Sequence, residues 1–369
     1  MMQIATITLY PLQLRLKSPF KTAHDVTYDR PLTLVAVTTT DGITGFGDIQ
    51  SFIDHAYAPE SQAESLAEVQ RLSRLMLGQT FDSATTLSNW LQAQSRHSFA
   101  KAALEMAAWD IQGKQQGQSL QQMIGGVGAT VPVGIAIGIQ TDAQATQRAI
   151  ATAVAQGYQR IKLKLAVDTD LQQLQSVLAT FPDQLFSVDA NAGWQPAMMD
   201  RLWTLEQVGV FMIEQPFAID DWQAHRAAQQ QLTQLHISLD ESLNDLKDVT
   251  QGLAVADAFT LKQAKIGGIW PTLQAIHQIS VVDKIPWIGG MLSSGVGRVV
   301  DLALASLPAT RQVPADSSSA SRYFERDIVL VQPEIVAGQL PVPSAPGLGV
   351  TIDWSAVADL QVADPIQIK

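Results

Sequence analysis

The chain has 369 residues, of which 46% are hydrophobic and 16% are charged. These proportions are typical of a globular protein with a large core, and the length predicts a large domain with a smaller one beside it. The formal net charge of -11 disfavours a nucleic acid or an anionic membrane as a partner. Because there is no cysteine, disulfides, thiolate nucleophiles and cysteine-bound metal centres are excluded.

Two patterns follow one another in the first third of the chain. Residues 1–50 alternate with a period of two, and the "DG" in "TLVAVTTTDGITGFGD" predicts a hairpin within a small antiparallel sheet. Residues 59–125 have the apolar spacing of helices and end in a glycine pair. We therefore predict an α+β domain over residues 1–125. The chain start lacks the pattern of a signal peptide and no run approaches a membrane span, so we expect a cytoplasmic protein.

Short apolar runs alternate with helical stretches after residue 126, which is typical of βαβ units with a parallel sheet. Eight such runs in about 190 residues predict a closed barrel over residues 126–324. The tail, residues 325–369, has Pro and Gly at short intervals and contains no further unit, so we expect it to join the first domain. The eight runs are 131–139, 160–166, 184–190, 209–215, 236–242, 258–264, 285–291 and 311–317.

Two lysines share one face of the second run, "RIKLKLA". Lys162 and Lys164 are two positions apart, and alternate residues of a strand point to the same side. Taken alone, the pair also fits an edge strand whose lysines face water and prevent aggregation. The other runs are needed to decide between an enclosed site and a solvated edge.

Five successive runs each carry a charge near their C-terminal end, spaced 22 to 26 residues apart: Lys164, Asp189, Glu214, Asp240 and Lys262. In a (β/α)8 barrel, this end of the strands is the face where active sites are built. Adjacent strands would place three carboxylates side by side, with lysines on both flanks. Such a pattern is far more specific than one acid at a strand end.

Three converging carboxylates require a compensating cation, because like charges raise one another's pKa. Oxygen ligands without cysteine, and without histidines at metal spacing, favour Mg²⁺, with Mn²⁺ as a possible substitute. A buried ionic network of these carboxylates with the lysines is the structural alternative, although buried ion pairs stabilise poorly.

The motifs "IKLKLA", "SVDANAGW", "FMIEQPF", "ISLDES", "TLKQAKIGG" and "GGMLSSGVGR" resemble the enolase superfamily, in its muconate-lactonising-enzyme-like subgroup. The resemblance runs nearly end to end. It implies a modified (β/α)8 TIM barrel of the α/β class with an α+β capping domain formed by both chain ends. It also implies that Asp189, Glu214 and Asp240 bind Mg²⁺. Lys164 and Lys262 would then face each other across the substrate, with Lys162 beside the metal and the substrate carboxylate.

The same resemblance implies a small carboxylate as substrate, an α-proton removed by a lysine, and a homo-oligomeric assembly. His24 lies in a segment that could close over the site. The implied substrate-binding residues are His24, Asn191, Gly290, Met291, Ser293 and Ser294.

Within the subgroup, "YAPES" and "DSSSASRY" are most similar to o-succinylbenzoate synthases and N-succinylamino acid racemases. The synthase reaction is a syn dehydration of 2-succinyl-6-hydroxy-2,4-cyclohexadiene-1-carboxylate in menaquinone synthesis, for which one lysine can act as base and then acid. A racemase requires both lysines. Since this chain has both, the number of lysines does not separate the two reactions. The synthase is our leading interpretation, and the racemase stays open.

Three other functions fit less well. Dipeptide epimerases carry an Asp-x-Asp motif at the eighth strand, where this chain has Asp316 alone. Muconate cycloisomerase is less similar in its motifs. A non-catalytic ligand-binding barrel would not require intact lysines and carboxylates. Two departures from the subgroup, Ser293 and Asp48 where glutamate is usual, leave all the predicted metal ligands in place.

Overall fold

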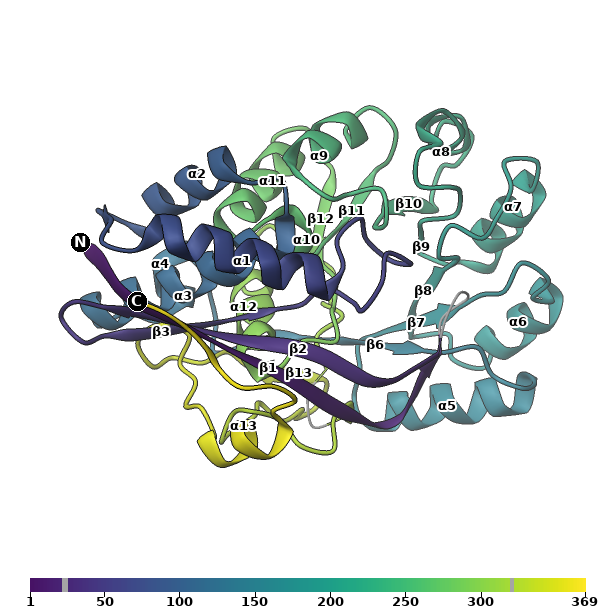
Figure 1. The fold of residues 1–369 in the computed structure, drawn as a ribbon. Coiled ribbons are helices and arrows are strands. Elements are labelled where there is room, and N and C mark those ends of the chain that lie inside the picture. The colour runs from purple at the N-terminus through teal and green to yellow at the C-terminus, as the bar shows by residue number, and fades with distance from the viewer. Residues whose placement is uncertain (22–25, 319–321) are drawn as a thin grey trace.

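The computed structural model describes residues 1–21, 26–318 and 322–369 (Figure 1). A long antiparallel hairpin begins the chain, with β1 (Met2–Lys21) paired to β2 (Val26–Thr39), and β2 pairs in turn with β3 (Thr44–Ile49). On the other side of β1 lies β14 (Ile366–Ile368), where Ile368 is opposite Ile7. The last strand of the chain therefore belongs to the same sheet as the first, while the exact domain limits remain a prediction.

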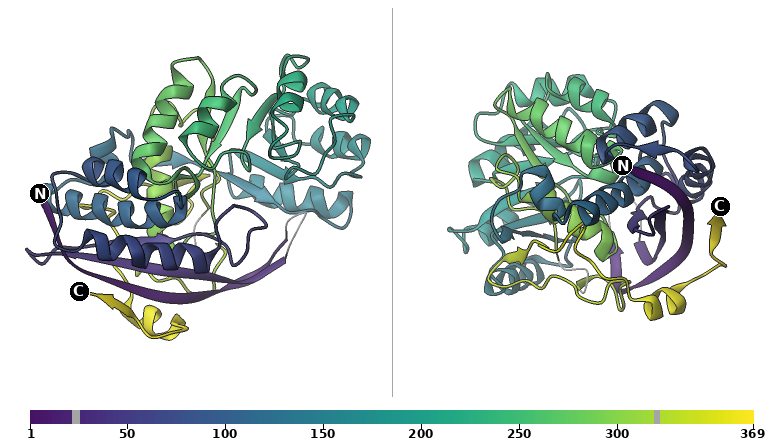
Figure 2. Two further views of the ribbon diagram at one scale, coloured as in Figure 1. Left: turned by 45° about the horizontal axis from the view of Figure 1, so that its top comes forward. Right: turned by 90° about the vertical axis from the view of Figure 1, so that its left-hand side faces the viewer.

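The helices between residues 62 and 116 lie on one side of this sheet (Figure 2). The longest of these helices, α3 (Ser98–Gln116), approaches β3 closely at Gly45 and Gly47. A Cβ at either glycine would lie about 2 Å from a carbonyl oxygen of α3. Ser61 caps the first helix in a reciprocal capping box with Glu64. The elements of this region are α1 (Gln62–Met76), β4 (Thr80–Phe81), α2 (Ala84–Gln94), α3 (Ser98–Gln116) and α4 (Leu120–Ile124).

Seven parallel strands form the second sheet, in the order of the chain from β6 to β12. This curled sheet, with helices outside and the antiparallel cap beside it, confirms the predicted fold class. The strands are β6 (Gly134–Ile137), β7 (Arg160–Lys164), β8 (Leu185–Asp189), β9 (Met212–Glu214), β10 (His236–Leu239), β11 (Ala258–Leu261) and β12 (Ile285–Ile288).

The helices of the barrel follow the strands along the chain. In the part of the chain that the structure describes, no helix is long and apolar enough to cross a membrane. The helices are α5 (Ala143–Ala155), α6 (Leu171–Leu178), α7 (Met199–Val208), α8 (Trp222–Gln229), α9 (Leu246–Gly252), α10 (Gln263–Ile266), α11 (Ile269–Ser280) and α12 (Gly295–Ala305). Outside the barrel sheet, β5 (Thr130–Pro132) pairs with β13 (Gln339–Pro341), and α13 (Trp354–Leu360) precedes β14.

The prediction of a regular eighth strand over residues 311–317 is wrong. Ala315 forms a single parallel bridge with Val133, and the amide of Asp316 donates to the carbonyl of Ile288 in β12 at 3.1 Å. This segment closes the ring between β12 and the start of β6 without a ladder. Pro314 has no amide hydrogen to donate, which interrupts strand pairing at this point.

A buried carboxyl of α3 predicts a pH-dependent stability. Glu105 is fully buried and accepts hydrogen bonds from Trp109 Nε1 at 3.0 Å and Trp270 N at 2.7 Å, yet burial raises its pKa to about 7. A raised carboxyl pKa stabilises the fold below the unfolded value near 4, and this contribution is lost as the pH rises through 7.

Glu105→Gln is therefore expected to remove up to about 3 kcal/mol of the decline in unfolding free energy between pH 5 and pH 8.5. Urea unfolding of the wild type and of Glu105→Gln at both pH values measures this change in unfolding free energy. An equal decline in both proteins would contradict the prediction.

Candidate active site

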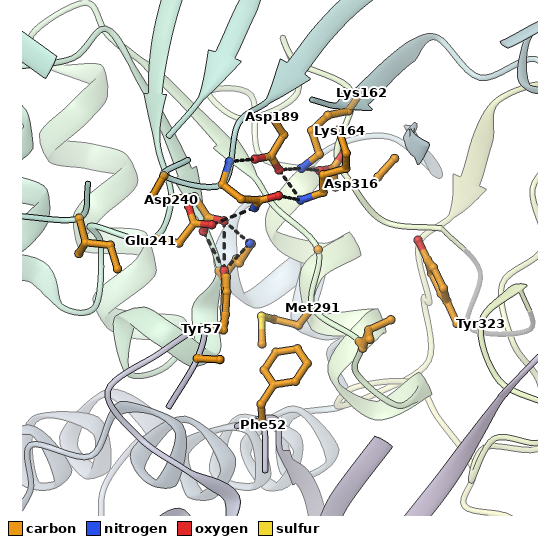
Figure 3. A pocket seen from close by; sticks show the side chains of 18 of the residues that line it. Phe52, Tyr57, Lys162, Lys164, Asp189, Asp240, Glu241, Met291, Asp316 and Tyr323 are labelled. Atoms are coloured by element: carbon orange, nitrogen blue, oxygen red, sulfur yellow. Dashed lines mark hydrogen bonds and ion pairs between the residues drawn. The ribbon is translucent and has the colours of Figure 1, made fainter. Parts of the chain in front are cut away.

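A cavity of about 160 Å³ lies at the C-terminal ends of the barrel strands. The capping domain covers it with the segment 52–57, which follows β3 and reaches the barrel (Figure 1). In Figure 3, Lys162, Lys164, Asp189 and Asp316 lie together, and Asp240, Glu241 and Tyr57 form a second group beside them. The cavity thus brings charged barrel residues under one loop of the cap.

The two lysines of β7 point into the barrel. β7 lies between β6 and β8, so the solvated edge-strand interpretation is wrong. Lys164 Nζ donates to Asp189 Oδ2 at 2.6 Å and to Asn191 Oδ1 at 2.8 Å. Lys162, which is only 5% exposed, contacts the carboxylates of Asp189, Glu214 and Asp316.

Lys262 enters from the other side of the site, directly after β11. Its ammonium donates to Asp240 Oδ2 at 2.6 Å and to the hydroxyl of Tyr57 at 2.5 Å. Burial disfavours the ammonium, but the nearby charges of Asp240, Glu214 and Glu241 outweigh it and raise the pKa of Lys262. Lys262 is therefore held as a cation in this arrangement of the site.

The three predicted metal ligands come from neighbouring strands. Asp189 and Glu214 are paired residues of β8 and β9, and Asp240 follows β10. All three are at most 2% exposed. Within the described ranges, no group of three acidic or histidine side chains is arranged so that it could hold a metal ion. Each of the three carboxylates instead forms an ion pair with a lysine.

The oxygens of this cluster nevertheless suit a hard cation. Oε1 of Glu214 and Oε2 of Glu241 are buried without a hydrogen-bond partner among the described residues. Burial, opposed by Lys162 and reinforced by Asp189 and Asp240, raises the pKa of Glu214 to about 8. These two free oxygens are donors of the type that Mg²⁺ prefers.

The predicted substrate contacts separate into three groups. Asn191, Gly290 and Met291 line the cavity. Ser293 and Ser294 do not: Ser294 caps α12 through Val296 N and donates from its hydroxyl to Asp48 at 2.6 Å, while Ser293 is buried beside it. His24 lies outside the described residues.

Three cavity residues that are not among the predicted site residues form hydrogen bonds or ion pairs with predicted ones. Tyr57 lies in the "YAPES" segment used only as a family motif, and Glu241 directly follows a predicted ligand. In the sequence, Asp316 stands out only as half of an epimerase motif. Its ion pair with Lys162 at 2.5 Å joins the ends of β7 and the barrel-closing segment, which no local pattern indicates.

A buried arginine fixes the cap loop to the barrel. Arg30 of β2 donates to the carbonyls of Leu292 at 3.0 Å and Ser51 at 2.7 Å, and to the carbonyl of Gln50. Its guanidinium lies 4.0 Å from the ring centroid of Phe52. The start of the cap loop and the loop after β12 are therefore held by one side chain.

Tyr57 connects this cap loop to the charged cluster. Its hydroxyl donates to Asp240 Oδ1 at 2.9 Å, accepts from Lys262, and its ring packs edge-on against Phe52. Tyr57→Phe keeps the ring and removes both polar contacts. We therefore expect kcat/KM for the reaction catalysed in this cavity to fall about tenfold. Steady-state kinetics measure this effect.

Tyr323→Phe is a matched control for Tyr57→Phe. Tyr323 lines the same cavity, and no hydrogen bond from its hydroxyl is found within the described ranges. Equal effects of the two substitutions would show that the contacts of Tyr57 with Asp240 and Lys262 have no special importance.

A parallel barrel with lysines and carboxylates at its strand ends, covered by an antiparallel cap, defines a class of barrel enzymes. A family model described as "Enolase C-terminal domain-like" matches residues 145–356. A second, described as "Mandelate racemase / muconate lactonizing enzyme, N-terminal domain", matches residues 4–125. The chain therefore belongs to the enolase superfamily and is an enzyme.

Curated relatives match almost the whole chain. An o-succinylbenzoate synthase of Enterococcus faecalis is 35% identical over 354 residues, covering 95% of this chain and 96% of that protein. An N-succinylamino acid racemase of Thermus thermophilus is 36% identical over 354 residues, covering 95% of each. A solved structure of an enolase superfamily member from Listeria innocua aligns with a TM-score of 0.96 at 30% identity, covering 100% of this chain and 99% of that one.

Proposed function

We propose that the protein is a Mg²⁺-dependent o-succinylbenzoate synthase. The observation that carries the proposal is the placement of Lys164 and Lys262 at the ends of β7 and β11, on either side of a buried carboxylate cluster. The relatives named as synthases at 32% to 35% identity support the choice of reaction.

Asp189, Glu214 and Asp240 would hold the Mg²⁺, which supplies positive charge next to the substrate carboxylate and so stabilises negative charge that develops there. The lysines around the cavity also favour an anionic substrate. Phe52 and Met291 provide apolar walls for its ring.

Lys164 performs the proton transfers in this proposal. As a neutral amine it removes the proton from the ring carbon that bears the carboxylate, and the electron pair of that C–H bond remains on the substrate. The adjacent carbon then loses its hydroxyl, which takes a proton from the Lys164 ammonium and leaves as water. A syn elimination needs only one such residue, since both groups leave from one face.

Lys262 stays protonated on the opposite side and stabilises the anionic intermediate by its charge. Its contacts with Asp240 and with the Tyr57 hydroxyl keep the ammonium in place. In this role Lys262 acts as a fixed cation rather than as a base.

Racemisation of N-succinylamino acids is the second candidate, favoured by the same pair of lysines. The proton leaves one face of the α-carbon and returns on the other, so both Lys164 and Lys262 must exchange protons. The racemase of Thermus thermophilus matches this chain as closely in identity as the synthases do.

Lys262→Arg tests these roles, because arginine keeps the charge and cannot act as a base near neutral pH. We expect aromatisation to stay within about tenfold of the wild-type rate, while any racemisation falls by at least about 100-fold. Absorbance and polarimetry measure the two reactions on the same samples. If aromatisation falls as far as racemisation, Lys262 is an acid or base in both reactions.

A further inference from the structure

Lys162 has an anionic partner that is not among the predicted metal ligands. Its ammonium lies 2.5 Å from Asp316 Oδ2, 2.8 Å from Glu214 Oε2 and 3.4 Å from Asp189 Oδ2. The shortest of the three contacts is therefore with Asp316, which comes from the segment that closes the barrel (Figure 3).

Asp316 is itself fixed by an arginine in the barrel interior. Arg160, fully buried and two positions before Lys162 on β7, donates from Nη2 to Asp316 Oδ1 and from Nε to the carbonyl of Pro314 at 2.9 Å. It also donates from Nη1 to Ser187 at 2.7 Å. One oxygen of Asp316 is thus occupied by Arg160, and the other faces Lys162.

This arrangement matters when a divalent cation enters the site. A cation bound to Asp189 and Glu214 repels an ammonium that shares the same carboxylates, and in a buried site such repulsion is weakly screened. Without Asp316, the carboxylates of the described residues that contact the Lys162 ammonium would be those of Asp189 and Glu214, so the ammonium would compete with the metal for them.

We propose that Asp316 is a positioning residue that holds the Lys162 ammonium on the non-ligand side of the cluster, so that Lys162 and a divalent cation can occupy the site together. Arg160 orients Asp316 for this role. The inference rests on the proposed Mg²⁺ site, at which Asp316 acts through Lys162 and is not one of the three proposed ligands.

A simpler effect has to be separated from this one. Any carboxylate near a cation attracts it, so Asp316→Asn would weaken metal binding even without Lys162. The two effects differ in their dependence on Lys162, because competition disappears when the ammonium is removed and direct attraction remains. A double-mutant cycle measures that difference.

The experiment is calorimetric titration of Mg²⁺ into metal-free protein, for the wild type, Asp316→Asn, Lys162→Ala and the double variant. We expect Asp316→Asn to raise the Kd for Mg²⁺ at least about tenfold when Lys162 is present, and less than about threefold in the Lys162→Ala background. Asp316→Ser, a smaller replacement, enters the same cycle in case Asp316→Asn does not fold, and circular dichroism checks each protein.

Equal losses in both backgrounds would overturn the inference and leave Asp316 as a nearby charge. A wild type that binds no Mg²⁺ would instead overturn the proposed function. The two failures are distinguishable because the first requires a wild type with measurable affinity.

Discussion

Lys164→Ala is expected to lower kcat for aromatisation by about 10³- to 10⁴-fold, because it removes the group proposed to take and return the proton. Lys164 Nζ reaches the cavity beside Asp189 and Asn191, and methyl-sized alanine leaves the approach to the substrate open. Stopped-flow or steady-state absorbance at saturating substrate measures the change.

Two controls separate chemistry from folding and metal loss. Lys247→Ala removes an exposed lysine of α9 and should leave kcat unchanged. In Lys164→Ala itself, Mg²⁺ should still bind, since the substitution removes a cation from Asp189. A variant that keeps more than about a tenth of the wild-type kcat would contradict the assignment of Lys164 as the base.

Glu214→Gln is expected to have an effect of similar size through the metal. Glu214 is 1% exposed, and one of its oxygens has no partner in the described part of the chain, which fits a metal donor. Replacing the carboxylate with an amide removes a charged ligand, so we expect Mg²⁺ affinity to fall at least about 100-fold and activity at ordinary Mg²⁺ concentrations to be lost.

Calorimetry of the metal-free variant and activity as a function of Mg²⁺ concentration measure this effect. Chelation of the wild type should likewise abolish activity, and added Mg²⁺ should restore it. Glu325→Gln, at an exposed position, is the matched control. Full activity in the presence of a chelator would favour the buried ionic network over a metal site.

The charged residues of the barrel could be predicted because their positions follow from strand geometry. Parallel strands present their C-terminal ends at one edge, so charges at the ends of five successive runs converge whatever the loops do. Lys164, Asp189 and Glu214 are adjacent in register across β7, β8 and β9. The alternation of β7 likewise placed Lys162 on the inner face.

Contacts between distant segments could not be predicted in this way. Tyr57 meets Asp240 across 183 residues, and the pairing depends on how the cap packs on the barrel. Ser294 caps a helix instead of lining the cavity, because a serine before an apolar helix satisfies the free amides at its start. The barrel-closing segment lacks a ladder at Pro314, and Asp316 reaches Lys162 there through tertiary packing alone.

The most direct test of the proposed function is the ultraviolet absorbance of purified protein mixed with Mg²⁺ and 2-succinyl-6-hydroxy-2,4-cyclohexadiene-1-carboxylate. We predict aromatisation that stops on chelation and resumes with added Mg²⁺. Polarimetry on N-succinylamino acids is run on the same preparation. Racemisation without aromatisation would contradict the synthase assignment and establish the second candidate.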